Sequence, residues 1–420
     1  MSNTQKKNVP ELRFPGFEGE WEEKKLGELR NPNDKYSYTG GPFGSDLKKS
    51  DYTTEGIQII QLQNIGDGYF YNRNRVFTSY EKAESLKSCN IFPGDIVIAK
   101  MADPIARAAI VPNNNGKYLM ASDGIRLSVD TLNFNTKFIL ECINRKSFRK
   151  KVEDNSSGST RMRIGLSTLG NLTIKTTTLN EQQRIAEFLS KLDRQIELEE
   201  QKLELLQQQK KGYMQKIFSQ ELRFKDENGN DYPDWEEKQL GEVAEIIGGG
   251  TPSTKNKLYW NGEINWFSPI EIGNKTYVYS SQKKITEEGL RKSSAKILPV
   301  GTILFTSRAG IGKTAILAKE STTNQGFQSI VPRKGLLDSY YVYTISNILK
   351  ILAEKVGAGS TFSEISKKQM EQLNLNIPMI KEQKNISKFF SKFDNLIEIH
   401  ERKLEFLKQR KQSLLQKMFV

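Results

Sequence analysis

Residues 181–218 read EQQRIAEFLSKLDRQIELEEQKLELLQQQKKGYMQKIF, and residues 382–419 repeat them without a gap as EQKNISKFFSKFDNLIEIHERKLEFLKQRKQSLLQKMF. Nineteen of the 38 aligned positions are identical. Neither copy contains proline, and Gly212 is the only glycine in the two copies. Each copy is therefore expected to form one uninterrupted helix.

Apolar residues recur in both copies at alternating intervals of three and four, which is the a and d pattern of a coiled coil. Two equal seams in one chain can satisfy each other, so we predict that the helices pair together; the alternative is that each lies on its own domain. The seam positions of the first copy, each matched 201 residues later in the second, are Ile185, Leu189, Leu192, Ile196, Glu199, Leu203, Leu206, Lys210, Tyr213 and Ile217.

Polar residues interrupt this seam in both copies. They are Glu199 and Lys210 in the first copy, and Lys411 and the single histidine of the chain, His400, in the second. Polar seam residues fix the register and orientation of paired helices at some cost in stability. One histidine cannot supply both a catalytic triad and a metal site, so we assign His400 to the seam.

A second repeat precedes each helix. Residues 10–14 and 21–28 read PELRF and WEEKKLGE, and they return at 220–224 and 235–242 as QELRF and WEEKQLGE. The order of entry segment, globular region and long helix therefore occurs twice. The predicted boundaries are 1–179 and 220–380 for the globular regions, and 180–219 and 381–420 for the helices.

The sequence patterns of the two globular regions predict the same mixed fold, of class α/β or more strictly α+β. Each has four short apolar runs with strand character followed by one helical segment, and a last short strand leads into the long helix. The expected strands are 57–61, 95–99, 108–111 and 125–129 in the first region, and 264–267, 302–306, 315–317 and 327–331 in the second. The expected helical segments are 135–154 and 337–356.

The composition indicates a water-soluble protein with a polyanionic partner. The chain has 420 residues, a net charge of +13 and a pI near 9.3, with a mean hydropathy of -0.58. We expect no membrane span, because no apolar run approaches 18 residues, and no secretory signal, because the first residues lack an apolar stretch. Cys89 and Cys142 are isolated, which favours a cytoplasmic location and argues against disulfides or structural zinc.

Motifs for nucleotide chemistry are incomplete. The run Gly312-Lys313-Thr314 lacks the glycine that a phosphate-binding P-loop needs at position 307, where serine stands. The adenine-methylation motif requires two successive prolines after Asn or Asp, but Asn31-Pro32 and Asp103-Pro104 are each followed by another residue. The sequence therefore predicts neither a nucleotide site nor a methyltransferase site.

A nuclease centre would need clustered carboxylates and a lysine. The carboxylates of Asp234 and Glu236 lie near Lys238, but they belong to the repeated entry segment and are too close in sequence to form such a centre. We therefore expect no catalytic residue, no metal site and no cofactor on this chain.

Basic and aromatic residues in the variable loops are the candidate site. Loops 39–52 and 248–257 are rich in Gly, Asn, Ser and Lys, and such loops on a rigid frame commonly carry recognition. Lys and Arg neutralise phosphates, whereas Arg, Asn and Gln can read base edges. The candidate DNA-binding residues are Lys48, Lys49, Arg73, Arg75, Arg107, Lys255, Lys257, Lys283, Lys284, Arg308 and Lys313.

Nearly the whole chain resembles the specificity (S) subunit of Type I restriction-modification systems. The resemblance rests on PELRFPGF at 10–17, GPFGS at 41–45, LNEQQRIA at 179–186, GGGTPS at 248–253 and YWNGEINWFS at 259–268. It implies two target recognition domains joined by antiparallel spacer helices with pseudo-two-fold symmetry, and no catalysis on this subunit. It also implies partners: two modification subunits that use S-adenosylmethionine, and restriction subunits that use ATP and Mg²⁺ to translocate and cleave DNA.

The resemblance implies a sequence-specific reader of a bipartite site in double-stranded DNA. A helix of 38 residues is roughly 57 Å long, which suits two readers more than one ~34 Å turn of DNA apart. The alternatives are a stand-alone nuclease or DNA methyltransferase, and a coiled-coil scaffold without a DNA role. The candidate partner-binding residues are apolar positions beyond the seam: Phe188, Leu198, Leu205, Phe389 and Phe406.

Overall fold

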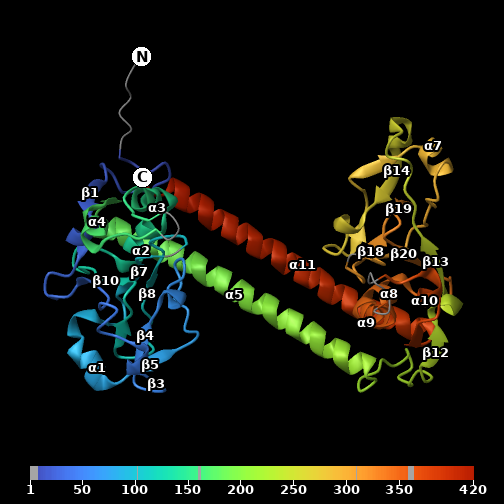
Figure 1. Ribbon diagram of the computed structural model, residues 1–420, viewed down its shortest axis with the longest axis horizontal. Coiled ribbons are helices and arrows are strands. Elements are labelled where there is room, and N and C mark those ends of the chain that lie inside the picture. Colours follow the sequence, from blue (N-terminus) through green and yellow to red (C-terminus); the bar gives the residue numbers. More distant parts are fainter. Residues whose placement is uncertain (1–7, 102, 159–161, 309, 358–363) are drawn as a thin grey trace, which may run out of the picture. The chain divides into compact units, whose positions relative to one another are not determined.

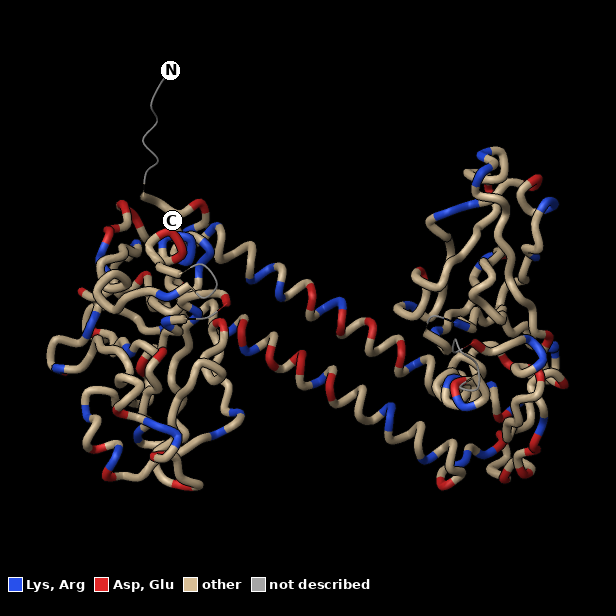
Figure 2. Tube along the Cα trace, viewed as in Figure 1, with Lys and Arg blue, Asp and Glu red and all other residues tan. Residues whose placement is uncertain are grey.

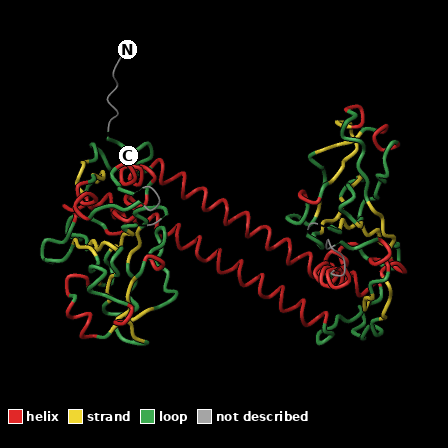
Figure 3. Tube along the Cα trace, in the orientation of Figure 1, coloured by secondary structure: helices red, strands yellow, loops and turns green. Residues whose placement is uncertain are grey.

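The computed structural model describes residues 8–101, 103–158, 162–308, 310–357 and 364–420. These residues form two compact units (Figure 1). Unit 1 combines Met1–Glu200 with Lys403–Val420, and unit 2 is Gln201–Arg402. Strands and loops make up most of the globular part of each unit, whereas the long segments are helical throughout (Figure 3).

The two repeats of the sequence form two long helices. Helix α5 spans Leu179–Phe218 and α11 spans Ile380–Lys417, so the prediction of uninterrupted helices is confirmed. Gln220, two residues after the end of α5, has a positive φ of 61°; a left-handed residue just past the last turn is a common way for a helix to end. Each unit contains residues from both helices. The contacts between α5 and α11 are therefore described first for unit 1 and then for unit 2.

The helices pair in antiparallel orientation within each unit. In unit 1, Asp193 meets Lys411 at 2.6 Å and Glu199 meets Lys403 at 2.9 Å, so the partner number falls as the α5 number rises. Leu192, Ile196 and Leu407 are buried between them. In unit 2, the ring of Tyr213 lies 5.2 Å from Phe389 and 5.8 Å from Phe393. The predicted antiparallel coiled coil is confirmed in both units.

The described residues of unit 1 form three sheets. The entry strand β1 (Glu22–Lys25) pairs with β11 (Thr173–Thr176), which leads into α5. The first main sheet is antiparallel, in the order β2 (Tyr38–Gly40), β10 (Gly124–Leu127), β7 (Ile96–Ala99) and β8 (Ala108–Ile110). The second has the order β3 (Tyr52–Thr53), β5 (Val76–Thr78), β4 (Ile57–Ile60), β9 (Tyr118–Met120) and β6 (Asn90–Ile91).

The described residues of unit 2 repeat the central part of this topology, with one strand more in the first main sheet and two fewer in the second. Strand β12 (Glu236–Gln239) pairs with β21 (Asn374–Ile377). The first main sheet has the order β13 (Ala244–Gly248), β20 (Gln328–Pro332), β17 (Ile303–Phe305), β18 (Thr314–Leu317) and β15 (Tyr277–Val278). The second has the order β16 (Lys283–Ile285), β14 (Trp260–Phe267) and β19 (Thr322–Thr323). In both units the central strand of the second sheet pairs with one parallel neighbour, β9 or β19. The expectation of one fold for both regions is confirmed.

Shorter helices cover the sheets. Unit 1 has α1 (Tyr80–Ser85), α2 (Thr136–Asn144), α3 (Lys146–Asp154) and α4 (Leu166–Asn171); unit 2 has α6 (Leu240–Val243), α7 (Glu287–Arg291), α8 (Ser339–Thr344), α9 (Ser346–Gly357) and α10 (Lys367–Glu371). The single helical segments expected at 135–154 and 337–356 are thus each two helices. In unit 1 the break occurs because Arg145 adopts an extended backbone, with φ -68° and ψ 143°.

Each hydrophobic core contains the start of one long helix and the end of the other. In unit 1, Leu189 near the start of α5 and Phe419 just after α11 pack in one cluster with Trp21. In unit 2, Ile217 at the end of α5 and Phe390 near the start of α11 share one core. The second helix of the chain therefore completes the core of the first globular region, and the first helix completes that of the second.

Candidate nucleic-acid interface

The variable loops of the two units begin at equivalent glycines, each directly after the first strand of the first main sheet. Gly41 follows β2, and Gly249 follows β13. A Cβ on Gly41 would lie 1.9 Å from the carbonyl oxygen of Ala121, and a Cβ on Gly249 would lie 1.9 Å from that of Asn324. No side chain fits at either position, so only glycine lets the backbone cross so closely. The two loops thus begin at the same place in the fold although their sequences differ.

Most of the predicted DNA-binding cations are exposed. Lys and Arg positions occur in the loops around β3 and β5 of unit 1 and at the end of unit 2 that carries β14 and α7 (Figure 2). Within the described ranges, no ion pair involves Lys49, Arg73, Arg75, Lys255 or Lys257, so these cations are available to neutralise phosphates. The exposed candidates are Lys48, Lys49, Arg73, Arg75, Lys255, Lys257, Lys283, Arg308 and Lys313, and the half-buried ones are Arg107 and Lys284.

A buried amide holds the unit 1 loop that carries Arg73. Asn64, which is 1% exposed, donates from its side chain to the carbonyls of Tyr71 and Arg73, both at 2.9 Å. The Arg73 guanidinium lies over the Tyr71 ring, 5.6 Å from its centroid. Next to them, the Gln58 amide donates to Asn72 at 3.0 Å. This loop therefore presents a guanidinium and an amide, the two groups best suited to base edges, from a fixed backbone.

Arg107 differs from the other candidates. Its guanidinium donates to the carbonyls of Leu62 at 2.9 Å and Asp103 at 3.3 Å. These bonds brace the loop before β8. Contact between Arg107 and DNA stays a prediction, whereas its bracing contacts are present in the protein alone.

Two tryptophans support the corresponding surface of unit 2. The rings of Trp260 and Trp266 lie 5.1 Å apart in an edge-to-face arrangement, and the Trp266 indole donates to the carbonyl of Gly250 at 2.8 Å. The Lys283 ammonium lies 6.0 Å from the centroid of Trp260, while Lys284 faces Glu263 at 3.8 Å. The sequence segments GGGTPS and YWNGEINWFS therefore meet in space.

The loop with Lys313 is not a nucleotide-binding P-loop. Thr314 begins strand β18, whereas a P-loop precedes a helix. The loop closes on Thr306, whose hydroxyl accepts from the Lys313 amide at 2.9 Å and whose carbonyl accepts from the Gly312 amide at 3.0 Å. The exposed Lys313 side chain is presented by this closed turn.

Sequence reasoning missed the polar contacts that join each entry segment to its own long helix. The Arg13 guanidinium donates to both carboxylate oxygens of Glu181, each at 2.7 Å. Hydrogen bonding to Glu181 raises the pKa of Arg13 above its ordinary value. Arg223 holds Glu382 in the same way, at 3.3 and 2.8 Å. The occurrence of both residues in both repeats was the signal that could have revealed them.

A second missed cluster lies beside the seam. In unit 1, Lys137 contacts Asp193 at 2.7 Å and Glu141 at 2.6 Å. Burial alone would lower the pKa of Lys137, but the two carboxylates raise it above its ordinary value. In unit 2, Asp394 pairs with Lys210 and accepts from the Tyr340 hydroxyl at 2.6 Å. Burial, and then this hydrogen bond, raise the pKa of Tyr340. Glu199, Lys210 and Lys411, three of the four predicted polar seam residues, therefore pair across the helices with residues outside the seam.

The candidate partner-binding residues fall into two groups. Phe188 is half-buried, with its ring 5.7 Å from that of Phe14. Phe389 lies 5.6 Å from Phe224 and also packs against the seam. By contrast Leu198, Leu205 and Phe406 are 48%, 53% and 61% exposed. Of the five candidates, only these last three present a large apolar surface.

Metal and membrane sites are not seen in the described residues. Across the part of the chain that the structure describes, no group of three or more His, Cys, Asp or Glu side chains could hold a metal ion. Among the described helices, none is both long and apolar enough to cross a membrane. Both cysteines are buried and unpaired.

Relatives support the interpretation of the fold. The MjaIX specificity subunit of Methanocaldococcus jannaschii is 37% identical over 211 residues, which cover 48% of this chain and 48% of that protein. The EcoR124I/EcoR124II specificity subunit of Escherichia coli is 36% identical over 166 residues, covering 38% of this chain and 41% of that protein. The chain thus spans about half the length of these curated relatives, or less.

Solved structures match over a greater length. The crystal structure of a Type I restriction-modification S subunit from M. genitalium has a TM-score of 0.64 at 18% identity, covering 98% of this chain and 99% of that one. A chain from a structure that concerns complex assembly and conformational transition of the type I R-M system has a TM-score of 0.54 at 18% identity, covering 95% and 97%. At such identities the likeness concerns the fold.

The family model gives the assignment. The model described as Type I restriction modification DNA specificity domain matches residues 18–208 and 232–409. These two matches coincide with the two repeats and together cover most of the chain. The protein therefore belongs to the Type I restriction modification DNA specificity family.

Proposed function

We propose that this protein is the DNA-recognition subunit of a Type I restriction-modification complex and reads a bipartite target, one half with each unit. The observation that carries the proposal is the repeated frame: the two main sheets have the same order of central strands in both units, and both units open their loops at an equivalent glycine. The loops themselves differ in sequence and in their exposed cations. One frame with two different reading surfaces is the arrangement that a two-part asymmetric target requires.

The charge of the loops supports DNA as the ligand. The net charge is +13, and most candidate cations lie exposed on loops rather than in ion pairs. Phosphate contacts by Lys and Arg supply affinity, while Arg73 and Asn72 in unit 1 offer the groups that distinguish bases. Trp260 and Trp266 give unit 2 a rigid support for its cations.

Partner proteins would carry the chemistry. We assign methyl transfer with S-adenosylmethionine to two modification subunits, and ATP-dependent translocation and Mg²⁺-dependent cleavage to restriction subunits, all in the cytoplasm. The exposed apolar residues Leu198, Leu205 and Phe406 are the docking positions that we favour for a modification subunit. Changing these three to glutamine should prevent complex formation on size exclusion, without loss of thermal stability in the isolated chain.

An exchange of one recognition region tests the proposal. Residues 235–378 are replaced by the matching region of a relative with a different target, and methylated adenines are mapped by single-molecule sequencing in cells that carry the partner subunits. Only one half of the methylated sequence should change. The reciprocal exchange of residues 21–176 is the matched control, and it should change only the other half. A change of both halves, or of neither, would show that the units do not read separately.

A further inference from the structure

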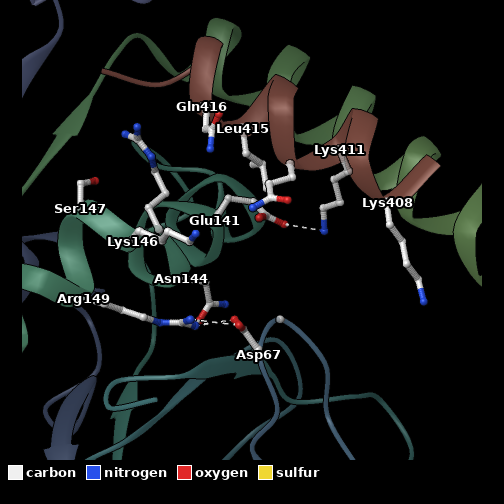
Figure 4. A pocket seen from close by; sticks show the side chains of 13 residues that line it. Asp67, Glu141, Asn144, Lys146, Ser147, Arg149, Lys408, Lys411, Leu415 and Gln416 are labelled. Carbon is white, nitrogen blue, oxygen red and sulfur yellow. Dashed lines mark hydrogen bonds and ion pairs between the residues drawn. The ribbon is translucent and has the colours of Figure 1, made fainter. Parts of the chain in front are cut away.

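The loop that joins β4 to β5 in unit 1 is held at two points. Asp67 accepts from the guanidinium of Arg149 in α3 at 3.0 Å, and Figure 4 shows this ion pair. The side-chain amide of Asn64 donates to the backbone carbonyls before and after Asn72, both at 2.9 Å. The backbone on either side of Asn72 is therefore fixed, so contacts of its side chain decide which group it presents to solvent.

A buried glutamine in β4 makes this contact. Gln58 is 2% exposed. Its Nε2 donates to Oδ1 of Asn72 at 3.0 Å, and its Oε1 accepts from Nδ2 of Asn115 at 3.3 Å. Asn72 and Asn115 are themselves exposed. Because a buried amide needs one acceptor and one donor as partners, the two asparagines turn opposite groups outward: the amino group of Asn72 and the oxygen of Asn115.

The same position in unit 2 also carries a buried amide. Ile59 of β4 and Trp266 of β14 are equivalent, because each pairs in parallel with the neighbouring strand, β9 or β19. The residue before each is Gln58 in unit 1 and Asn265 in unit 2. Asn265 is 8% exposed. The central strand of the second sheet therefore places a buried amide at this position in both units.

The two amides reach equivalent residues but hold different groups. Asn265 donates from its side chain to the backbone carbonyl of Tyr279 at 3.4 Å. Tyr279 and Asn72 each lie four residues before the next strand of the second sheet, β16 or β5. Unit 2 thus holds a backbone carbonyl and leaves the Tyr279 side chain 61% exposed. Unit 1 holds a side chain, and so fixes which of its polar groups faces outward.

We propose that Gln58 determines part of the base specificity of unit 1, by positioning Asn72 as a hydrogen-bond donor and Asn115 as an acceptor toward DNA. This inference rests on the proposed function, and it adds the groups that unit 1 presents to a base pair. Gln58 itself is a positioning residue, because it is buried and acts through the two asparagines.

The two ends of this chain of amides select different bases. In the major groove, guanine and thymine present acceptor oxygens, whereas cytosine presents only an amino donor. The amino group of Asn72 therefore favours guanine or thymine and rejects cytosine, because two donors that face each other are both left without a partner. The oxygen of Asn115 favours the amino groups of cytosine or adenine.

Methylation rates of the complex between the full chain and its modification subunits test this inference. The substrates are duplexes in which each base pair of the unit 1 half-site is replaced in turn. Asn72→Ala first identifies the base pair that Asn72 reads, because discrimination there should fall about tenfold and stay unchanged elsewhere.

Gln58→Glu should change the preference at that same base pair. A carboxylate only accepts hydrogen bonds, so Asn72 must turn its amino group inward and present its oxygen. Cytosine should then become preferred about tenfold at about pH 8.5, where the carboxylate is ionised. The base pair read by Asn115 should keep its preference, since Asn115 already donates to residue 58. Gln58→Leu holds neither asparagine and should abolish the discrimination against cytosine without reversing it.

Gln63→Glu is the matched control. It makes the same change of charge in the same loop, but the Gln63 side chain is exposed and donates to Gln61 at 2.8 Å. It should leave every base preference unchanged. A merely structural role of Gln58 would lower the rates on all duplexes alike.

That result would overturn the inference, as would an unaltered preference in either Gln58 variant, or an Asn72→Ala variant that changes discrimination at no base pair. A wild-type complex whose rate does not depend on the unit 1 half-site would instead refute the proposed function. Equal thermal unfolding of the Gln58 and Gln63 variants shows that the fold is intact.

Discussion

The substitution Phe419→Ala should destabilise unit 1, although most residues of that unit lie more than 200 positions earlier in the sequence. Phe419 is 3% exposed, and its ring stacks on Phe138 at 5.2 Å and meets Trp21 edge-on at 5.9 Å. The Arg145 guanidinium lies 5.4 Å from the same ring. Removal of the ring leaves a cavity among side chains that α2 and the entry segment hold in place.

The expected cost follows from this burial. A buried Phe→Ala change typically costs about 3–5 kcal/mol. Because Phe419 follows the last helical residue, Lys417, its backbone can relax, and we expect about 3–4 kcal/mol. At about 1.4 kcal/mol per factor of ten, amide protection in the core of unit 1 should fall roughly 10²- to 10³-fold.

Hydrogen exchange followed by mass spectrometry measures this effect separately in each unit. Protection should fall in β7 and β10 of unit 1 and stay unchanged in β17 and β20 of unit 2. Phe406→Ala, on the same helix but 61% exposed, is the matched control and should change stability by less than about 0.5 kcal/mol. If Phe419→Ala instead loosened β17 and β20, each long helix would serve its own domain, and the exchange of helix ends between cores would be wrong.

Four further predictions concern the helices and the loops. Gly212→Ala should stabilise the chain by about 0.5–1 kcal/mol in urea unfolding, because a Cβ there meets nothing within 4 Å and glycine is unfavourable inside a helix; a loss of stability would contradict this. The pKa of Tyr340 is raised in the folded protein. The stability that its protonated form contributes is therefore fully present below pH ~10 and is lost as the pH rises further. Tyr340→Phe should reduce the loss of stability of unit 2 at alkaline pH, measured by hydrogen exchange, and an unaltered loss would refute this. Changing Lys48, Lys49, Lys255 and Lys257 to glutamine should reduce the log-log salt slope of DNA binding, measured by fluorescence anisotropy, by roughly 0.9 for each phosphate that is no longer neutralised, and an unaltered slope would remove these lysines from the interface. One heptad inserted after both Glu204 and Glu405 lengthens each helix by about 10 Å, so the gap between half-sites in the methylome should grow by roughly one to three base pairs; an unchanged gap would mean that the helices do not set it.

Local patterns were sufficient to predict the frame. The seam spacing predicted both long helices, which begin only two residues earlier than the repeat itself, at Leu179 and Ile380. The strands expected at 57–61 and 95–99 are β4 (Ile57–Ile60) and β7 (Ile96–Ala99), because short apolar runs of this kind are recognisable where they are buried. The incomplete P-loop was rightly set aside, since Thr314 begins a strand. These elements are determined by the spacing of apolar residues and by the positions of glycine and proline, which are properties of residues close in sequence.

Contacts between distant residues were beyond such reasoning. The corner at Arg145, whose side chain donates to the carbonyl oxygens of Phe419 and Val420, is an example, because no local signal relates these distant residues. Phe188 and Phe389 were apolar positions outside the seam, and sequence alone could not distinguish packing on Phe14 and Phe224 from docking of a partner. The repeat shows that Phe218 and Phe419 are equivalent residues. It does not show that Phe218 packs in the core of unit 2 and Phe419 in the core of unit 1.

This exchange of helix ends has a consequence for the order in which the protein is made. The ribosome finishes the strands of unit 1 before residue 200, yet the core of that unit also needs Met418 and Phe419. At about 5–20 residues per second, roughly 10–45 s pass between the two events. During that time Trp21 and Phe138 lack an aromatic partner that they have in the finished fold. Unit 2 has no such delay, because Ile217 and Phe218 are synthesised before its strands. The first region to emerge is therefore the last that can complete its core, and an interrupted chain would carry an unfinished unit 1.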